Sequence, residues 1–312
     1  MHKAPPTPKG FRDIKPDFAK KRREVINIIA GILEKEGFQP IETPTLEFAE
    51  TLEGKYGDEE RLIYKFTDRG GRKLALRFDL TVPLARFVAN NQSLLNPTFS
   101  RYQIGQVFRG ENPQHGRYRE FTQFDFDTVG SANLKEDAKV ILAAVKSIKK
   151  IGITSALMLI NDRKNFEQFP QDVIRAVDKL HKVGEAGIKE ELKEKGMAID
   201  DIENHLYKIK NSKPTENLNQ IFSTLEGEGL KQGRDFTFDP TLARGLDYYT
   251  GSIFELKPST NSVDLTIGSG GRYDNLIGMF MGNKTNLPAG RQVPAVGFSF
   301  GLDRIVDLLL ND

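Results

Sequence analysis

The segment between residues 101 and 130 constrains the fold of this chain more than any other part of the sequence. It predicts two strands, about 101–109 and 118–129, joined by a polar loop over 110–116. Successive side chains of a strand point to opposite faces of a sheet, so the second strand has one apolar and one polar face. The even positions include Tyr118, Phe124 and Phe126, and the odd positions are Arg117, Arg119, Phe121, Gln123, Asp125 and Asp127. Such a polar face is typical of a solvent-facing strand and also of a pocket for a polar ligand, and the pattern leaves both interpretations open.

The sequence before this segment predicts two helices and a hairpin. The first helix begins at Asp17 as its N-cap and ends near Glu36, with a stripe that consists of Val25, Ile29, Ile32 and Leu33. The runs 61–68 and 72–79 flank Arg69-Gly70-Gly71, which is a hairpin signal. Thr81 and Pro83 are expected as the cap and first turn of a helix that continues to about residue 91.

The sequence after it alternates between strands and helices. A helix is expected over 138–150 and a strand over 156–160. Residues 165–232 are rich in Lys, Glu and Leu at helical spacing, with breaks at Gly184, Gly196 and Pro214, which predicts a helical insertion. Strands are expected at 249–256 and 295–300, and the last helix carries Arg304 near its start.

The composition excludes several classes of function. The 312 residues include 45 Lys+Arg and 43 Asp+Glu, so no global positive field marks a nucleic-acid binder, and such binding would need local patches like the basic N-terminal stretch. The absence of Cys excludes thiolate nucleophiles, and four scattered His argue against a multi-histidine metal site. No apolar run reaches the roughly 18 residues of a membrane helix, and residues 1–10 lack the apolar core of a signal peptide. We therefore expect a cytoplasmic protein without a metal centre.

Two glycine-rich segments do not match known nucleotide-binding motifs because their spacing is wrong. The arginine side chains are then the candidate ligands for phosphate groups. In the cluster at 268–271 the third glycine of a dinucleotide fingerprint would fall at Tyr273, and Lys284 is wrongly spaced for a P-loop. The arginines that stand at strand ends or in polar motifs are Arg109, Arg117, Arg119, Arg244 and Arg304. Guanidinium groups bind phosphate oxygens through paired donors and stay charged when partly buried. A sheet that presents several of them can hold a triphosphate without a glycine loop, and Phe121 on the same face can stack on a base.

These motifs resemble those of a known family, the histidyl-tRNA synthetases of class II. Phe108-Arg-Gly-Glu111 and the segment 116–127 (GRYREFTQFDFD) resemble motif 2 of that class. The segment 242–251 (LARGLDYYTG) is similar to the histidine-specific signature, 297–304 (GFSFGLDR) to motif 3, and the surroundings of Pro44 to motif 1 at the dimer interface. The resemblance runs from about residue 8 to 310.

The resemblance implies an α+β fold, in which an antiparallel sheet is flanked by helices and a helical insertion domain interrupts the catalytic domain. The expected boundaries are 1–164 for the first catalytic part with motifs 1 and 2, 165–232 for the insertion, and 233–312 for the second catalytic part. The implied partners are L-histidine, ATP with Mg²⁺, tRNA(His) and a second copy of the chain. The implied activity is formation of histidyl-adenylate with release of pyrophosphate, followed by transfer of histidine to the tRNA.

The resemblance also implies a role for each matched residue. Arg109 and Arg244 are the implied catalytic residues, at the α-phosphate and the histidine carboxylate. The implied ATP-binding residues are Arg109, Glu111, Arg117, Phe121 and Arg304. The implied histidine-binding residues are Asp79, Thr81 and Gln123 for the α-ammonium, Asp127 and Tyr249 for the imidazole, and Arg244 and Tyr248 beside them. A neutral imidazole has one donor and one acceptor nitrogen, so a site that satisfies both rejects isosteres.

Two departures from the family pattern leave an alternative open. Only residues 305–312 follow Arg304, where the family continues into an anticodon-binding domain, and the link 283–293 is longer than usual. The regulatory subunit of ATP phosphoribosyltransferase is a synthetase-like histidine sensor that also lacks this domain. The intact signature with Arg244 and the insertion at 165–232 favour the enzyme.

Overall fold

The core of the protein is an eight-stranded, mostly antiparallel sheet. The computed structural model describes residues 5–95, 98–113, 116–243, 248–258, 265–281 and 292–311. In spatial order the strands are β1 (Gln39–Pro40), β5 (Phe99–Phe108), β6 (Glu120–Val129), β11 (Ala295–Gly301), β10 (Gly268–Arg272), β9 (Ser252–Pro258), β7 (Ala156–Asp162) and β8 (Phe236–Phe238). Among the strands of the described residues, the two edge pairs, β1 with β5 and β7 with β8, are parallel, and the others are antiparallel. The expected antiparallel sheet and the two strands around the polar loop are confirmed.

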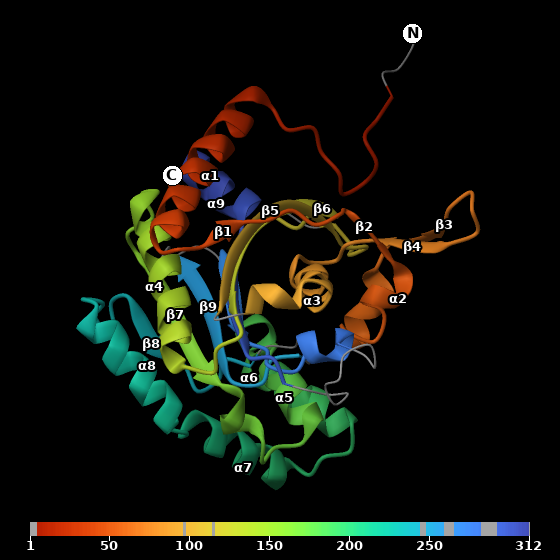
Figure 1. Cartoon of the computed structure of the whole chain (residues 1–312). Coiled ribbons are helices and arrows are strands. Elements are labelled where there is room, and N and C mark those ends of the chain that lie inside the picture. Colours follow the sequence, from red (N-terminus) through yellow and green to blue (C-terminus); the bar gives the residue numbers. More distant parts are fainter. Residues whose placement is uncertain are drawn as a thin grey trace.

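One face of this sheet is covered by helices that bury apolar stripes against it (Figure 1). These helices are α1 (Pro16–Lys35), α4 (Leu134–Lys150), α8 (Glu216–Gly227) and α9 (Leu302–Asn311). Phe124 and Phe126, on the apolar face of β6, join their core, as the alternation in the sequence predicts. The apolar side of β6 is therefore committed to the core, which leaves its odd-numbered side chains for the opposite face.

The opposite side of the sheet carries a smaller layer. It contains α2 (Ala49–Leu52), α3 (Thr81–Asn90) and a three-stranded sheet of β2 (Leu46–Phe48), β4 (Lys73–Leu76) and β3 (Lys65–Thr67). The antiparallel pairing of β3 with β4 confirms the expected hairpin. Short 3-10 turns lie at η1 (Gly57–Leu62), η2 (Gln92–Leu95), η3 (Arg163–Phe166) and η4 (Ile277–Phe280).

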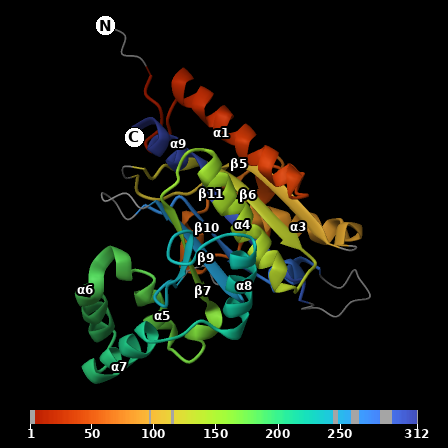
Figure 2. The same ribbon diagram turned by 90° about the vertical axis from the view of Figure 1, so that its left-hand side faces the viewer.

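The segment between β7 and β8 is helical, as its spacing predicts. Figure 2 shows α5 (Gln171–Val177), α6 (Leu180–Glu194) and α7 (Ile199–Lys210) gathered at one end of the sheet, where they share an apolar cluster of their own. The fourth helix, α8, packs on α4 and belongs to the main core. The division into domains at 165 and 232 stays a prediction.

Several predicted helix ends and one strand start differ from the structure. Lys15 is the N-cap of α1, and Pro16 and Asp17 lie in its first turn because proline fits the first helical position. Thr81 is the first residue of α3 and not its cap, because Leu80 is the N-cap; the carboxylate of Asp79 accepts the hydrogen bond from the Val82 amide in the first turn. The helix predicted to start at 138 begins at Leu134, and β9 starts at Ser252 instead of residue 249. In the described part of the chain, every helix is too short or too polar to cross a membrane.

Candidate active site

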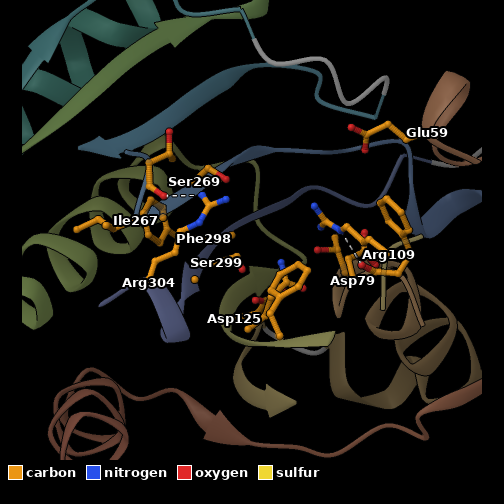
Figure 3. Close-up of a pocket in the computed structure, with 18 of the residues that line it drawn as sticks. Glu59, Asp79, Arg109, Asp125, Ile267, Ser269, Phe298, Ser299 and Arg304 are labelled. Carbon is orange, nitrogen blue, oxygen red and sulfur yellow. Dashed lines mark hydrogen bonds between the residues drawn. The ribbon is translucent and has the colours of Figure 1, made fainter. Parts of the chain in front are cut away.

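A cavity of about 380 Å³ opens on the face of the sheet that faces α3 (Figure 3). Its floor is made by β6, β10 and β11, and its walls include residues around β4, α3 and the start of α9. The cavity gathers these side chains that the resemblance implies: Asp79, Thr81, Arg109, Glu111, Arg117, Phe121, Gln123, Asp127, Tyr248, Tyr249 and Arg304. Arg244 lies outside the described residues. The structure thus brings the predicted residues together, while their individual roles stay predictions.

The polar face of β6 forms part of the cavity floor. The cavity is lined by Phe121, Gln123, Asp125 and Asp127. The polar face predicted from the sequence therefore belongs to a pocket and not to a solvent-facing strand. Arg119 is the exception, because its guanidinium donates to the backbone carbonyls of Lys9 and Glu111.

Glycines in β10 and β11 make room for the carboxylates of β6. Gly297 pairs with Asp127, and a Cβ on Gly297 would stand 1.8 Å from Asp127 Oδ1. A Cβ on Gly270 would lie 2.1 Å from the carbonyl oxygen of Gly297. The glycine cluster that failed as a dinucleotide motif therefore has a packing function, since it lets side chains and backbone approach closely.

One end of the cavity is cationic. The Nε of Arg109 donates to the Phe78 carbonyl at 3.2 Å, and its guanidinium lies 5.2 Å from the Phe121 ring centroid. Arg304 donates to the carbonyl oxygens of Gly116 and Thr266, at 3.3 Å and 2.8 Å. Arg117 forms a 3.5 Å ion pair with Glu111. Three guanidiniums gather at this end of the cavity, so it suits an anionic ligand with several oxygens.

The other end combines buried carboxylates with tyrosines. Asp79 Oδ1 accepts from the Tyr56 hydroxyl and from the Val82 amide, both at 3.0 Å. Desolvation raises the pKa of Asp79, although Arg109 and these hydrogen bonds oppose the shift. Burial also raises the pKa of Tyr248 well above its ordinary value, so its hydroxyl keeps its proton. Tyr248 and Tyr249 pack together with their ring centroids 4.9 Å apart.

Asp127 on the cavity floor belongs to a buried cluster with Tyr273 and Arg101. Its Oδ1 accepts from the Tyr273 hydroxyl, and its Oδ2 forms a 2.6 Å ion pair with Nη2 of Arg101. Arg101 is fully buried and also donates to the backbone carbonyls of Asp125 and Leu80. Desolvation raises the pKa of Asp127, and Arg101 opposes this. The cluster fixes the position of Asp127 before any ligand binds.

The site residues predicted from the sequence do not include Asp125, Arg101 and Tyr273. Asp125 carries a visible signal, because it occupies an odd position between Gln123 and Asp127. Arg101 becomes relevant only through the pairing of β5 with β6, which sets it opposite Asp127. Tyr273 gives no signal in the sequence, since only the fold of β10 beside β11 brings it to Asp127.

Comparisons with known proteins agree with this geometry. The family model described as Histidyl-tRNA synthetase matches residues 10–173 and 156–305. A histidine–tRNA ligase of Aeropyrum pernix is 40% identical in an alignment 336 positions long, which covers 97% of this chain and 74% of the relative. The crystal structure of histidyl-tRNA synthetase from Nostoc sp. PCC 7120 matches with a TM-score of 0.81 at 28% identity, over 98% of this chain and 75% of that chain.

A further solved structure shares the fold. The protein described as an ATP phosphoribosyltransferase regulatory subunit/histidyl-tRNA synthetase from Bacillus halodurans C has a TM-score of 0.79 at 24% identity, over 99% of this chain and 84% of that chain. The sheet and the arginine-lined cavity are those of a class II aminoacyl-tRNA synthetase. The chain belongs to the histidyl-tRNA synthetase family, and it spans about three quarters of the length of the relatives it matches.

Proposed function

We propose that this protein is a histidine–tRNA ligase whose cavity joins histidine to ATP and then transfers it to tRNA(His). The observation that carries the proposal is the division of one cavity into a cationic end and an end of carboxylates and tyrosines. The first end suits a triphosphate, and the second suits an ammonium group and an imidazole. The sequence similarity to histidine–tRNA ligases supports the same activity.

The cationic end is proposed to bind ATP. Phe121 stacks on the adenine, Arg117 and Arg304 bind the γ-phosphate, and Arg109 binds the α-phosphate. The histidine carboxylate attacks the α-phosphorus and pyrophosphate leaves, while Arg109 and Arg244 stabilise the negative charge that develops.

A Mg²⁺ ion is proposed to accompany the ATP. Mg²⁺ is commonly held by one or two carboxylates together with substrate phosphates. Glu111 offers such a carboxylate at the phosphate end, and the described residues contain no cluster of three or more ligands that would form a separate metal centre. The ion would supply further positive charge at the phosphates, and Glu111 would orient it.

The other end is proposed to bind histidine. Asp79, Thr81 and Gln123 receive the α-ammonium group; the Gln123 Oε1 is buried without a partner among the described residues. Asp127 and Tyr249 flank the imidazole ring, and Tyr248 supports them. The helices α5–α7 are proposed to approach the tRNA acceptor stem.

A second copy of the chain is proposed to pack on the three-stranded sheet that follows motif 1. Leu46 and Phe48 on β2 and Phe66 on β3 are large apolar side chains that stay exposed there. Adjacent exposed apolar side chains of this kind mark association surfaces.

Histidine-dependent exchange of pyrophosphate into ATP tests the proposed activation step. We expect exchange with the unaltered protein and a loss of several orders of magnitude in kcat for Arg109→Ala and Arg244→Ala, because both groups stabilise the transition state. The alternative, a histidine sensor, predicts histidine binding without any exchange. Binding without exchange would therefore replace the proposal by that alternative.

Asp127→Ala tests the assignment of the two ends of the cavity. The change removes a buried partner at the imidazole end, at a cost of about 1–3 kcal/mol in binding. We expect the KM for histidine to rise about tenfold or more, with little change in the KM for ATP. Equal effects on the two KM values would contradict the assignment.

A further inference from the structure

Asn161 is a fully buried amide that does not line the cavity and that the roles proposed so far do not use. It stands next to the last residue of β7. Its Nδ2 donates to the backbone carbonyls of Pro240 and Leu242, both at 3.2 Å. Its Oδ1 accepts from the Asp162 amide at 2.8 Å and from Nδ2 of Asn165 at 2.9 Å. Because each end of the side-chain amide has two partners, the network fixes its orientation.

The two carbonyls that Asn161 binds belong to a stretch of chain that has just left the sheet. The parallel pairing of β8 with β7 ends at Phe238, opposite Ile160, and the Asp239 amide then donates to the Ile160 carbonyl. Beyond the end of a strand pair, a buried backbone carbonyl needs its hydrogen bond from another group, such as a side chain. Asn161 is the next residue of β7 and supplies this bond. Its side chain therefore helps to decide where the chain runs as it leaves β8.

Leu242 is also the first residue of the signature segment, 242–251, which resembles the histidine-specific signature of the family. Its side chain is 4% exposed and packs in the apolar cluster of α5–α7. At the other end of the segment, the Gly251 carbonyl accepts from the Arg163 amide at 2.9 Å. The end of β7 and the turn that follows it therefore hold both ends of the signature segment.

The signature segment contributes side chains to the proposed reaction. Tyr248 and Tyr249 line the cavity at its proposed histidine end. Arg244 is the proposed catalytic group at the α-phosphate, and it follows the anchored start of the segment by two positions. A displacement of about 1 Å in a catalytic group can slow a reaction by about a hundredfold. The proposed ATP-binding residues belong to other elements, so loss of the anchor should slow the chemical step more than it weakens ATP binding.

We propose that Asn161 is a positioning residue for the reaction, which fixes the start of the signature segment at Leu242 and acts on the chemical step through that segment. The inference rests on the proposed function, because it names a residue that supports the same cavity. The position requires an amide, since one end of the side chain must donate and the other must accept. Asn161→Asp keeps the shape of the side chain, but a carboxylate has no donor for the two carbonyls.

Histidine-dependent exchange of pyrophosphate into ATP is the first measurement, with kcat referred to the number of sites that form adenylate in a burst. We expect Asn161→Asp and Asn161→Ala to lower kcat about tenfold or more and to leave the KM for ATP within about twofold. Asn165→Ala removes only one donor to the Asn161 Oδ1 and should show the same pattern more weakly. The control is Asn133→Ala, which removes the N-cap of α4; it should lower the melting temperature by a few degrees without changing either constant.

A double-mutant cycle separates positioning from a general loss of structure. If Asn161 acts through the signature segment, adding Asn161→Asp to Arg244→Ala should slow the reaction by less than about a further twofold. Added to Arg304→Ala, on α9, the same change should multiply the loss in kcat/KM, because the two residues serve different parts of the cavity. Losses that multiply with Arg244→Ala, or equal rises in the KM values for histidine and ATP, would overturn the inference.

Hydrogen–deuterium exchange tests the anchor without any catalytic activity. Backbone amides of peptides that span 239–251 should exchange about tenfold faster or more in Asn161→Asp than in the unaltered protein, and at an unchanged rate in Asn133→Ala. If this pattern appears but the unaltered protein shows no pyrophosphate exchange, the ligase activity is rejected and Asn161 still positions the segment. If pyrophosphate exchange occurs and Asn161→Asp changes neither the amide exchange nor kcat, the ligase activity stands and the inference falls.

Discussion

At the scale of single residues, the contacts around Asp127 leave no space for an added atom. Asp127 is wedged between the Tyr273 hydroxyl, the Arg101 guanidinium and the backbone of Gly297. Such close packing transmits small changes, because protein interiors do not absorb an extra methyl group without shifting their neighbours.

Gly297→Ala is therefore expected to displace the Asp127 side chain. The added Cβ would stand 1.8 Å from Oδ1, so the strand, the carboxylate or both must move. We expect a loss of stability of about 1–3 kcal/mol and a larger rise in the histidine KM than in the ATP KM. Urea unfolding and exchange kinetics measure both. Gly31→Ala is the control, since its Cβ meets nothing within 4 Å in the middle of α1; alanine should leave activity unchanged and raise helix stability by up to about 1 kcal/mol.

Desolvation raises the pKa of the buried Asp125 carboxyl, and this has a consequence for stability. Its ordinary pKa is 3.8 and its folded value is about 7, so between these pH values the folded state holds a proton that the unfolded chain has lost. The contribution of the Asp125 carboxyl to the free energy of unfolding is fully present below pH 3.8 and is lost as the pH rises through 7. Asp125→Asn removes this titration, and its gain in free energy of unfolding should grow from near zero at pH 4 to at most about 4 kcal/mol at pH 8. Urea unfolding at several pH values measures the difference in free energy of unfolding between Asp125→Asn and the unaltered protein. A difference that stays constant with pH would contradict the raised pKa of Asp125.

At the scale of elements, Asp303 at the start of α9 joins three parts of the chain that are distant in sequence. Its Oδ2 accepts from the Thr122 amide of β6 at 2.8 Å, and its Oδ1 lies 3.4 Å from Arg12 and 3.5 Å from Arg22. The basic N-terminal stretch is thus partly structural, because two of its arginines hold α9 and β6 together. Its neighbour Arg304 lines the cavity, so the same junction positions part of the site.

Asp303→Ala is expected to cost about 3 kcal/mol, because two guanidiniums and a buried amide lose their acceptor. The KM for ATP should also rise, since Arg304 and the loop before β6 lose their support. Asp307→Ala is the matched control on the same helix; it lies 3.8 Å from Arg12 but is 35% exposed, and exposed pairs contribute less than about 1 kcal/mol. Equal losses for the two variants in thermal unfolding would argue against the junction.

At the scale of the whole molecule, the exposed apolar side chains of the three-stranded sheet determine the proposed association. Phe48→Asp places a charge where a second copy is proposed to pack, so the dimer should dissociate at concentrations at which the unaltered protein stays paired. Sedimentation velocity measures this. Tyr207→Asp is the control, because Tyr207 is 68% exposed on α7, away from β2 and β3. An unaltered protein that sediments as a monomer would contradict the proposed dimer.

The sequence by itself determined the elements and much of the site. The alternation in 118–129 predicted both the strand and its polar face, since that periodicity is a local property of the backbone. The resemblance of the motifs to those of the histidyl-tRNA synthetases implied many of the residues that line the cavity, and it also implied Arg244, which lies outside the described part. Helix ends were less well predicted: Thr81 was expected as the cap of α3, but Leu80 is its N-cap and Thr81 its first residue.

The tertiary structure decided what depends on partners distant in the chain. Tyr273 reaches Asp127 only because β10 lies beside β11 and β11 beside β6. Arg101 is set opposite Asp127 by strand register, and Gly297 is required by the carboxylate across from it. The charge state of Asp125 depends on burial, on one shared guanidinium and on two nearby carboxylates, none of which a linear pattern contains. Local periodicity follows from the chain, whereas register, burial and electrostatic environment are set when distant segments pack together.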